Sequence, residues 1–345
     1  MRLKTSLGIA IGTALGTLVA VRSLRARRAI DFAGKTVVIF GGSRGLGLAM
    51  GREFSSAGAH VVLTARDEQE LERAAADIAE QGGQVTTIAC DVTDREQIER
   101  TIGRIVHDRG GIDVLVNNAG IIQVGPVEHM TVDDFEEAMA THFWGPLFTI
   151  LAALPHMRGS RARRIVNISS VGGKIAVPHL LPYTASKFAL TGLSEGLRAE
   201  LAGQGFAVTT VCPGLMRTGS TYNAMFKGQH RHEFAWFHLS NAIPGVSMSA
   251  ARAARRIVDA CRHGDPEVIL TPSAKLAVLA NGISPSTTAR LLTLANHLLP
   301  SPSPDNGIRA HSGWQSVSKY VPSAVTRLAD RATVENNELP DASTS

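Results

Sequence analysis

The chain has 345 residues, which is enough for one large α/β domain with extensions or for two small domains. Its 44% hydrophobic content, 33 glycines and 5% aromatic content are typical of a globular protein with many tight turns. The formal net charge of +5 comes largely from local arginine clusters. Because no basic stripe interleaved with aromatic residues is present, we expect no nucleic-acid partner.

The first feature along the chain is an uncharged run over residues 7–21, with basic residues on both sides. At about 1.5 Å per residue, a helix of this length spans about 22 Å, which is short of a hydrocarbon core of about 30 Å. Snorkelling of Lys4 and Arg22 extends its reach, and the arginines that follow favour a cytoplasmic body. We expect residues 1–30 to form a hydrophobic membrane anchor and a basic linker, with a secretory signal as the alternative.

From Lys35 onward, short β-branched runs alternate with stretches of helical length. The predicted strands are residues 36–40, 60–64, 85–90, 114–116, 164–168, 207–211 and 268–270. The predicted helices are residues 46–58, 67–81, 93–109, 131–158 and 183–204. This alternation predicts one α/β, Rossmann-type domain over residues 31–272, with a doubly wound parallel seven-stranded sheet. Ligands of such sheets bind beyond the carboxyl ends of the strands.

The rest of the chain, residues 273–345, is predicted to be a C-terminal helical extension and a flexible tail. Apolar periodicity from Ser273 to Leu299 indicates a helix pair that lies on the body, on the membrane or on a second subunit. Residues 301–345 are rich in Pro, Ser, Asp and Asn, so we expect the last stretch to be frayed or disordered.

A glycine-rich turn follows the first predicted strand. Its residues of interest are Gly41, Ser43, Arg44, Gly45, Leu46 and Gly47. Glycines here allow a tight turn and a close approach to a pyrophosphate, and the N-terminus of the next helix supplies unpaired N–H donors. Its place between a strand and a helix favours a dinucleotide site over an ordinary glycine turn.

The end of the second predicted strand bears on the identity of the dinucleotide. An NAD site usually has an acidic residue here, whereas this chain has Ala65 followed by Arg66. The guanidinium groups of Arg66 and Arg44 suit a 2′-phosphate. The sequence therefore predicts NADP as the cofactor, the alternative being that both arginines are solvated surface residues.

Further motifs follow at the ends of later strands, and Tyr183-x-x-x-Lys187 comes after Ser170. In this order they resemble the short-chain dehydrogenase/reductase family from about Ala33 to Leu270. The resemblance implies cofactor contacts at the glycine-rich turn, Asp91, Val92, Asn118, Ala119, Gly120, Tyr183, Lys187, Pro213, Gly214 and Thr218. It also implies catalytic roles for Ser170, Tyr183 and Lys187, and a homodimer or homotetramer built through the long central helices.

The chemistry of the motif follows from its spacing. Tyr183 and Lys187 are i and i+4, so they share one helix face. A free tyrosine has a pKa near ~10, and a nearby ammonium and the nicotinamide cation are expected to lower it, making Tyr183 the acid/base. Ser170 is expected to hydrogen-bond the substrate oxygen, while the nicotinamide supplies the hydride. The alternative is an ordinary pair on a helix surface.

His142 is the main departure from the family pattern, which commonly has an Asn at this point of the central helix. In the resembling enzymes, that Asn is thought to hold a water that links the lysine to bulk solvent. Histidine can donate and accept hydrogen bonds and can shuttle protons, so we expect His142 to preserve the relay as a fourth catalytic residue. The alternative is an altered or lost relay.

The segment between Thr218 and Ser249 is rich in aromatic and apolar residues. In the resembling family this region is a mobile lid, so we expect a hydrophobic substrate, with packing against the core or a partner subunit as the alternative. The three histidines of the segment lack strong carboxylate or cysteine partners, and Cys90, Cys212 and Cys261 are widely spaced. We therefore predict no metal site.

The leading functional prediction is a membrane-anchored NADP(H)-dependent oxidoreductase with its catalytic domain in the cytoplasm. It would interconvert a hydrophobic alcohol and its ketone or aldehyde. A non-catalytic NADP-binding scaffold or redox sensor is the alternative, which the substitution at His142 keeps open. A sugar-nucleotide epimerase or dehydratase is disfavoured by Ala65 and by the lack of a large C-terminal substrate domain.

Overall fold

The computed structural model describes residues 23–242, 247–304, 307–317 and 323–339. The predicted anchor over residues 7–21 lies outside this part of the chain and stays a prediction. Within the described ranges, no helix combines the length and the apolar character that crossing a bilayer requires.

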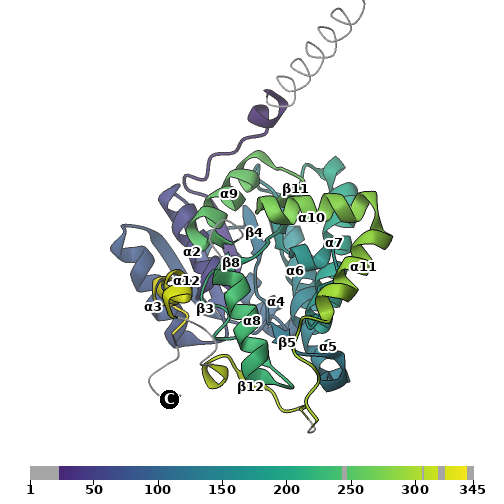
Figure 1. Ribbon diagram of the computed structural model, residues 1–345. Coiled ribbons are helices and arrows are strands. Elements are labelled where there is room, and N and C mark those ends of the chain that lie inside the picture. The colour runs from purple at the N-terminus through teal and green to yellow at the C-terminus, as the bar shows by residue number, and fades with distance from the viewer. Residues whose placement is uncertain (1–22, 243–246, 305–306, 318–322, 340–345) are drawn as a thin grey trace, which may run out of the picture.

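A parallel sheet of seven strands runs through the centre of the molecule, in the order β11-β7-β6-β4-β1-β2-β3 (Figure 1). The strands are β1 (Thr36–Phe40), β2 (His60–Ala65), β3 (Gln84–Ala89), β4 (Val114–Asn117), β6 (Arg164–Ile168), β7 (Ala207–Cys212) and β11 (Glu267–Ile269). The predicted doubly wound sheet is confirmed. The strand order reverses between β1 and β4, and ligands of such sheets bind at this switch point.

Helices cover both faces of the sheet. The α-helices of the described residues are α2 (Gly45–Ser56), α3 (Glu68–Glu80), α4 (Arg95–Arg109), α5 (Val132–Met139), α6 (Gly145–Met157), α7 (Leu181–Leu201), α8 (His230–Ala242), α9 (Ala250–His263), α10 (Pro272–Ile283), α11 (Pro285–Asn296) and α12 (Ser323–Glu335). Helices α2, α3 and α9 share one apolar core with the sheet, and α4 and α6 share a second core on the other face. Residues 37–39 of β1 and 114–116 of β4 are apolar and fully buried, because both faces of these strands are covered.

The long central helix is not continuous as predicted over residues 131–158. A π-helical turn over Ala140–Trp144 lies between α5 and α6. His142 belongs to this turn, and its side chain is fully buried. Single π-turns inside helices are frequent at functional sites. Here the turn places the His142 ring edge-on to the Tyr183 ring, with 5.4 Å between their centroids.

Short strands and α8 lie beyond the carboxyl edge of the sheet. The short strands are β5 (Gln123–Val124), β8 (Met216–Arg217), β9 (Met225–Phe226), β10 (Met248–Ser249) and β12 (His311–Ser312). Phe226 and Phe234 are buried in a small apolar core of this region. Part of the aromatic content of the predicted lid therefore packs inward, while Met225 and Phe237 line a cavity.

The C-terminal segment is folded onto the body as far as residue 339, and the predicted frayed end beyond it, residues 340–345, lies outside the described part of the chain. Helix α12 packs against α8, and Tyr222 Oη donates to Asp330 Oδ1 at 2.7 Å. Figure 1 shows α12 beside α3 and α8. Glu338, which follows the helix, is only 3% exposed. Residues from distant parts of the chain supply the hydrogen-bond partners of this polar segment.

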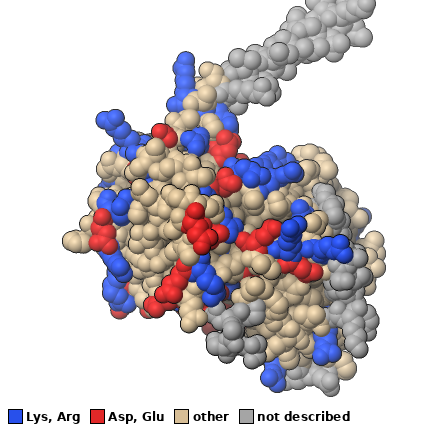
Figure 2. Space-filling view, turned by 90° about the vertical axis from the view of Figure 1, so that its left-hand side faces the viewer, with Lys and Arg blue, Asp and Glu red and all other residues tan. Residues whose placement is uncertain are grey.

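Acidic and basic side chains lie intermixed on the face of the molecule that Figure 2 shows. Some of these charges form ion pairs between neighbouring helices. Arg52 Nε lies 2.6 Å from Asp77 Oδ2, and this pair links α2 to α3. Because the charges of each pair lie so close together, their electric fields largely cancel at distances beyond a Debye length.

Candidate active site

A cavity of about 980 Å³ opens along the carboxyl edge of the sheet. Ser170, Tyr183, Lys187 and His142, the predicted catalytic residues, all line it. The predicted cofactor residues that line it are Gly41, Ser43, Arg44, Gly45, Leu46, Arg66, Asp91, Val92, Asn118, Ala119, Gly120, Pro213, Gly214 and Thr218, together with Tyr183 and Lys187. Gly47 is not part of the lining, because it packs against the inside of the turn.

Close backbone packing forms the glycine-rich turn. A Cβ atom on Gly41 would lie 2.5 Å from Ala119 Cα, and one on Gly47 would overlap the carbonyl oxygen of Gly41. Asn118 Nδ2 donates to the same carbonyl at 2.6 Å, which ties the turn to the end of β4. The turn leads directly into α2, so the N-terminus of that helix lies at the cavity.

Two hydrogen-bond donors of the turn bind a carboxylate of the chain. Glu70 of α3 accepts from Ser43 Oγ at 2.8 Å and from Arg44 Nη1 at 2.6 Å. A hydroxyl and a guanidinium that converge on charged oxygens form a donor set that suits a phosphate. Arg66 is exposed and lines the same cavity. The residues present therefore fit a dinucleotide with a phosphate at this end.

The predicted catalytic residues lie at the other end of the cavity. Tyr183 and Lys187 belong to α7, and Ser170 caps the short 3₁₀ turn that follows β6, where its Oγ accepts from Gly172 N–H at 3.0 Å. Lys187 Nζ donates to Ile168 O at 2.8 Å and lies 5.7 Å from the centroid of the Tyr183 ring.

The pKa values of this pair differ from the prediction. Burial raises the pKa of Tyr183, and a hydrogen bond with Ser170 offsets this only in part. Burial also lowers the pKa of Lys187 to about 7. The expectation that the ammonium lowers the pKa of the phenol is therefore wrong for the protein's own groups. Desolvation outweighs the charge of a lysine whose Nζ is directed at a backbone carbonyl.

Both ring nitrogens of His142 are engaged in hydrogen bonds. Its Nε2 accepts from the N–H of Ile121 at 3.1 Å, and its Nδ1 lies 2.7 Å from Ser186 Oγ. Because Nε2 accepts, the ring proton of the neutral form sits on Nδ1 and is donated to Ser186. Burial and the charge of Lys187 lower the pKa of His142 well below its usual range. This arrangement connects the loop at Ile121 to α7 through the His142 ring, and the relay stays a prediction.

A buried ion pair at the substrate end was not predicted. Lys227 Nζ donates to Asp134 Oδ2 at 2.6 Å, and both residues line the cavity. Asp134 also accepts from Thr131 N–H at the start of α5, where it completes a capping box. The sequence gives no signal for the pair, because each residue alone resembles an ordinary cap or surface charge.

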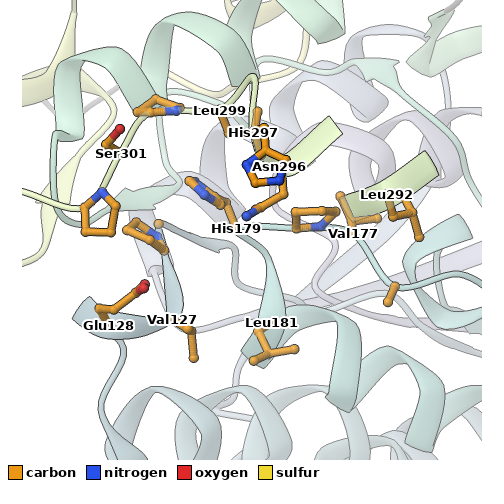
Figure 3. A pocket seen from close by; sticks show the side chains of 16 residues that line it. Val127, Glu128, Val177, His179, Leu181, Leu292, Asn296, His297, Leu299 and Ser301 are labelled. Carbon is orange, nitrogen blue, oxygen red and sulfur yellow. The ribbon is translucent and has the colours of Figure 1, made fainter. Parts of the chain in front are cut away.

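A second pocket of about 430 Å³ adjoins the substrate end. Val177 lines both cavities. In Figure 3, Leu299 and His297 lie on one side of this pocket, and Val127 and Leu181 lie on the other. Its lining is largely apolar and comes from loops near the active site, the start of α7, α11 and the chain that follows α11. Together the two cavities offer room for a bulky apolar molecule.

Comparisons with known proteins agree with this geometry. A family model described as short chain dehydrogenase matches residues 35–226. A dehydrogenase/reductase SDR family protein 7-like of Anopheles gambiae is 34% identical over 271 residues, which are 77% of this chain and 83% of the relative. A fatty acyl-CoA reductase of Acinetobacter baylyi is 32% identical over 271 residues, which are 78% of this chain and 86% of the relative.

A solved structure supports the same assignment. A metagenomic short-chain oxidoreductase in complex with NADP has a TM-score of 0.58 and 28% identity, covering 70% of this chain and 99% of its own. The family model spans more than half of the present chain and contains the glycine-rich turn, Ser170, Tyr183 and Lys187. The chain therefore belongs to the short-chain dehydrogenase/reductase family, whose members are oxidoreductases that act on CH–OH groups with a nicotinamide cofactor.

Proposed function

We propose that the protein is an NADP(H)-dependent oxidoreductase that interconverts a hydrophobic alcohol and its ketone or aldehyde. One observation carries the proposal: a single cavity holds Ser170, Tyr183 and Lys187 at one end and the anion-binding pair Ser43 and Arg44 at the other. The nicotinamide, when bound, supplies or accepts the hydride.

The residues of α7 and the adjoining turn handle the proton. In the reductive direction, Tyr183 Oη donates its proton to the carbonyl oxygen, and Ser170 Oγ hydrogen-bonds the same oxygen as charge develops there. Lys187 Nζ lies 5.7 Å from the centroid of the Tyr183 ring, where it can exchange protons close to the phenol. With a pKa of about 7, it exchanges its own proton readily at neutral pH. His142 acts as a positioning residue, because its neutral ring joins α7 to the loop at Ile121.

The choice of NADP is supported by three observations on the chain. Ala65 offers no carboxylate for ribose hydroxyls, Arg66 lines the cavity, and Ser43 with Arg44 binds a carboxylate in the manner expected for a phosphate. The solved relative in complex with NADP points the same way.

Fluorescence titration with NADPH and NADH tests this choice. Arg66→Ala should weaken NADPH binding by roughly 10- to 100-fold, because a charged hydrogen bond is worth about 1.5–3 kcal/mol, while NADH binding changes little. Arg100→Ala is the matched control, since Arg100 is exposed on α4 and pairs with Glu96. Equal or tighter binding of NADH by the unaltered protein would exclude the NADP assignment.

A hydrophobic substrate is supported by the adjoining apolar pocket and by the name of the Acinetobacter relative, a fatty acyl-CoA reductase. NADPH oxidation with a series of aldehydes and ketones of increasing chain length tests it. We expect kcat/KM to rise with chain length, because each buried CH₂ contributes about 0.8 kcal/mol. Binding of NADPH without turnover of any carbonyl or alcohol would favour the scaffold or sensor instead.

We also propose that residues 7–21 anchor the protein, with the catalytic domain in the cytoplasm. The aliphatic side chains exposed on and after α10 and α11 support an apolar environment next to the body: Leu276, Leu279, Ile283, Leu291, Leu294 and Leu298. Carbonate washing of membranes tests the anchor, and release of the full-length protein would refute it.

A homodimer or homotetramer is proposed on similar grounds. Trp144, Leu151 and Phe188 are exposed on the long helices that the family resemblance places at subunit contacts. Exposed large apolar residues on helices of this kind suit an interface between copies. Analytical ultracentrifugation of the purified protein measures the state, and a monomer at all concentrations would refute it.

A further inference from the structure

The residues that follow α12 lie on the phosphate end of the cofactor cavity. Asn336 O accepts from the N–H of Gly45, the first residue of α2, at 2.8 Å. Asn337 Nδ2 donates to Ser43 O at 2.9 Å and to Glu70 O at 3.0 Å. The C-terminal residues thus bond to both the glycine-rich turn and α3.

Glu338 brings a carboxyl group to the same place. Its Oε2 accepts from Asn223 Nδ2 at 2.6 Å and lies 3.6 Å from Arg44 Nε. A Cβ atom on Gly45 would lie 2.6 Å from Glu338 Oε1, so the carboxyl sits directly against the start of α2. The side chain lines the cavity and is almost fully buried. Helix N-termini of this kind bind anions through their free N–H groups.

Arg44 is shared between two carboxyl groups of the chain. Its Nη1 lies 2.6 Å from Glu70 Oε1, and its Nε lies 3.6 Å from Glu338 Oε2. This guanidinium is also the group proposed to hold the 2′-phosphate. Carboxylate and phosphate oxygens compete for such donors, because both bind them through charge-assisted hydrogen bonds.

We propose that Asn336–Glu338 is a gate on the cofactor cavity, which the phosphates of the dinucleotide displace on binding. The backbone carbonyl of Asn336 and the carboxyl of Glu338 take up donors that phosphate oxygens would use. The inference rests on the proposed NADP(H) site and adds a built-in competitor to it. The apparent affinity for the cofactor is then the intrinsic affinity multiplied by the fraction of molecules with the gate open.

The gate is suited to displacement because polar contacts hold it. Arg52 Nη2 donates to Glu335 O at 2.8 Å, and Arg73 Nε donates to Asn337 Oδ1 at 2.9 Å. Segments held mainly by such hydrogen bonds open more readily than apolar cores do. Burial opposes ionisation of Glu338 and raises its pKa to about 7, with Arg44 acting against this shift and Glu70 adding to it.

Helix α12 connects the gate to the substrate side of the cavity. It packs against α8, and Asp330 accepts from Tyr222 Oη at 2.7 Å. Phe237 and Asn241 of α8 line the cavity near the substrate end. A movement of α12 on displacement of the gate would therefore be passed to α8, which faces the substrate end of the cavity.

Asn337→Gly tests the gate in the full chain. The backbone of Asn337 has a φ of 56°, which glycine adopts without strain, so the substitution removes side-chain hydrogen bonds and keeps the turn. With the gate weakened, we expect the NADPH dissociation constant from fluorescence titration to fall about tenfold, as for the loss of one or two net hydrogen bonds. Glu335→Gln is the control, since Glu335 is exposed and pairs with Arg331, and its dissociation constant should not change.

Hydrogen–deuterium exchange gives an independent readout. Saturating NADPH should speed exchange in peptides covering residues 329–339 and slow it at residues 41–47. Slower or unchanged exchange of the C-terminal peptides with NADPH bound, or an unchanged or weaker affinity of Asn337→Gly, would overturn the gate and leave the proposed function standing. Failure of both the unaltered protein and the variant to bind NADPH or NADH would overturn the proposed function itself.

Discussion

The two ends of the cavity are assembled in different ways. At the catalytic end, Tyr183 and Lys187 stand one helical turn apart on α7, and Ser170 lies directly after β6. At the phosphate end, Asn337 bonds to Ser43 across a separation of 294 residues. The contrast teaches that short-range motifs carry the proposed chemistry of this site, whereas contacts without any local motif form the proposed gate.

Replacing the phenol gives the largest expected effect, and it isolates the catalytic end. Tyr183→Phe should lower kcat/KM by roughly 10²- to 10⁴-fold, the usual worth of a positioned acid/base, because the proton donor to the carbonyl oxygen is lost. The NADPH dissociation constant should stay close to that of the unaltered protein, because the phosphate end is untouched. Steady-state kinetics and fluorescence titration measure the two quantities, and retained turnover would refute the role of Tyr183.

A pair of glycine-to-alanine substitutions separates the effect of steric crowding in the turn from the effect of helix propensity. Gly47→Ala should destabilise the fold by about 2 kcal/mol or more, because its Cβ overlaps the carbonyl oxygen of Gly41. Gly103→Ala, in α4 where nothing lies within 4 Å of the added carbon, should stabilise it by about 0.5–1 kcal/mol. Thermal and urea unfolding measure both changes. Similar shifts in the two variants would show that close packing does not hold the turn.

The smallest effect is a pH dependence at the phosphate end. Burial raises the pKa of Glu338 from 4.5 to about 7, so the docked gate favours the protonated acid. The equilibrium constant for docking of the gate should therefore fall by up to about tenfold per pH unit as the pH rises from 4.5 to 7. It should stay level above pH 7. Because a weaker gate competes less, the NADP⁺ dissociation constant of the unaltered protein, divided by that of Glu338→Gln, should fall as the pH rises over this range.

Calorimetry between about pH 5.5 and 8 measures that ratio. The comparison with Glu338→Gln removes the titration of the cofactor's own phosphates, because both proteins bind the same ligand. Parallel pH profiles of the two proteins would contradict a gate whose docking depends on the proton of Glu338.

Most of the fold could be predicted from the sequence, for a clear physical reason. Strands such as Thr36–Phe40 are β-branched and apolar, and the turn after them needs glycine at Gly41. Both signals are local. The π-turn at His142 and the direction of Lys187 toward Ile168 O depend on how helices pack on the sheet, so periodicity and spacing alone could not predict them.

The sequence alone determined the order of strands and helices along the chain and the glycine-rich turn after β1, because these depend on residues close together in the chain. Tertiary structure decided the pKa values of Tyr183 and Lys187, since these depend on desolvation by surrounding elements. It also decided that the polar C-terminal residues are ordered over the turn at Gly45. Only folding can supply the hydrogen-bond partners that a segment of such composition lacks locally.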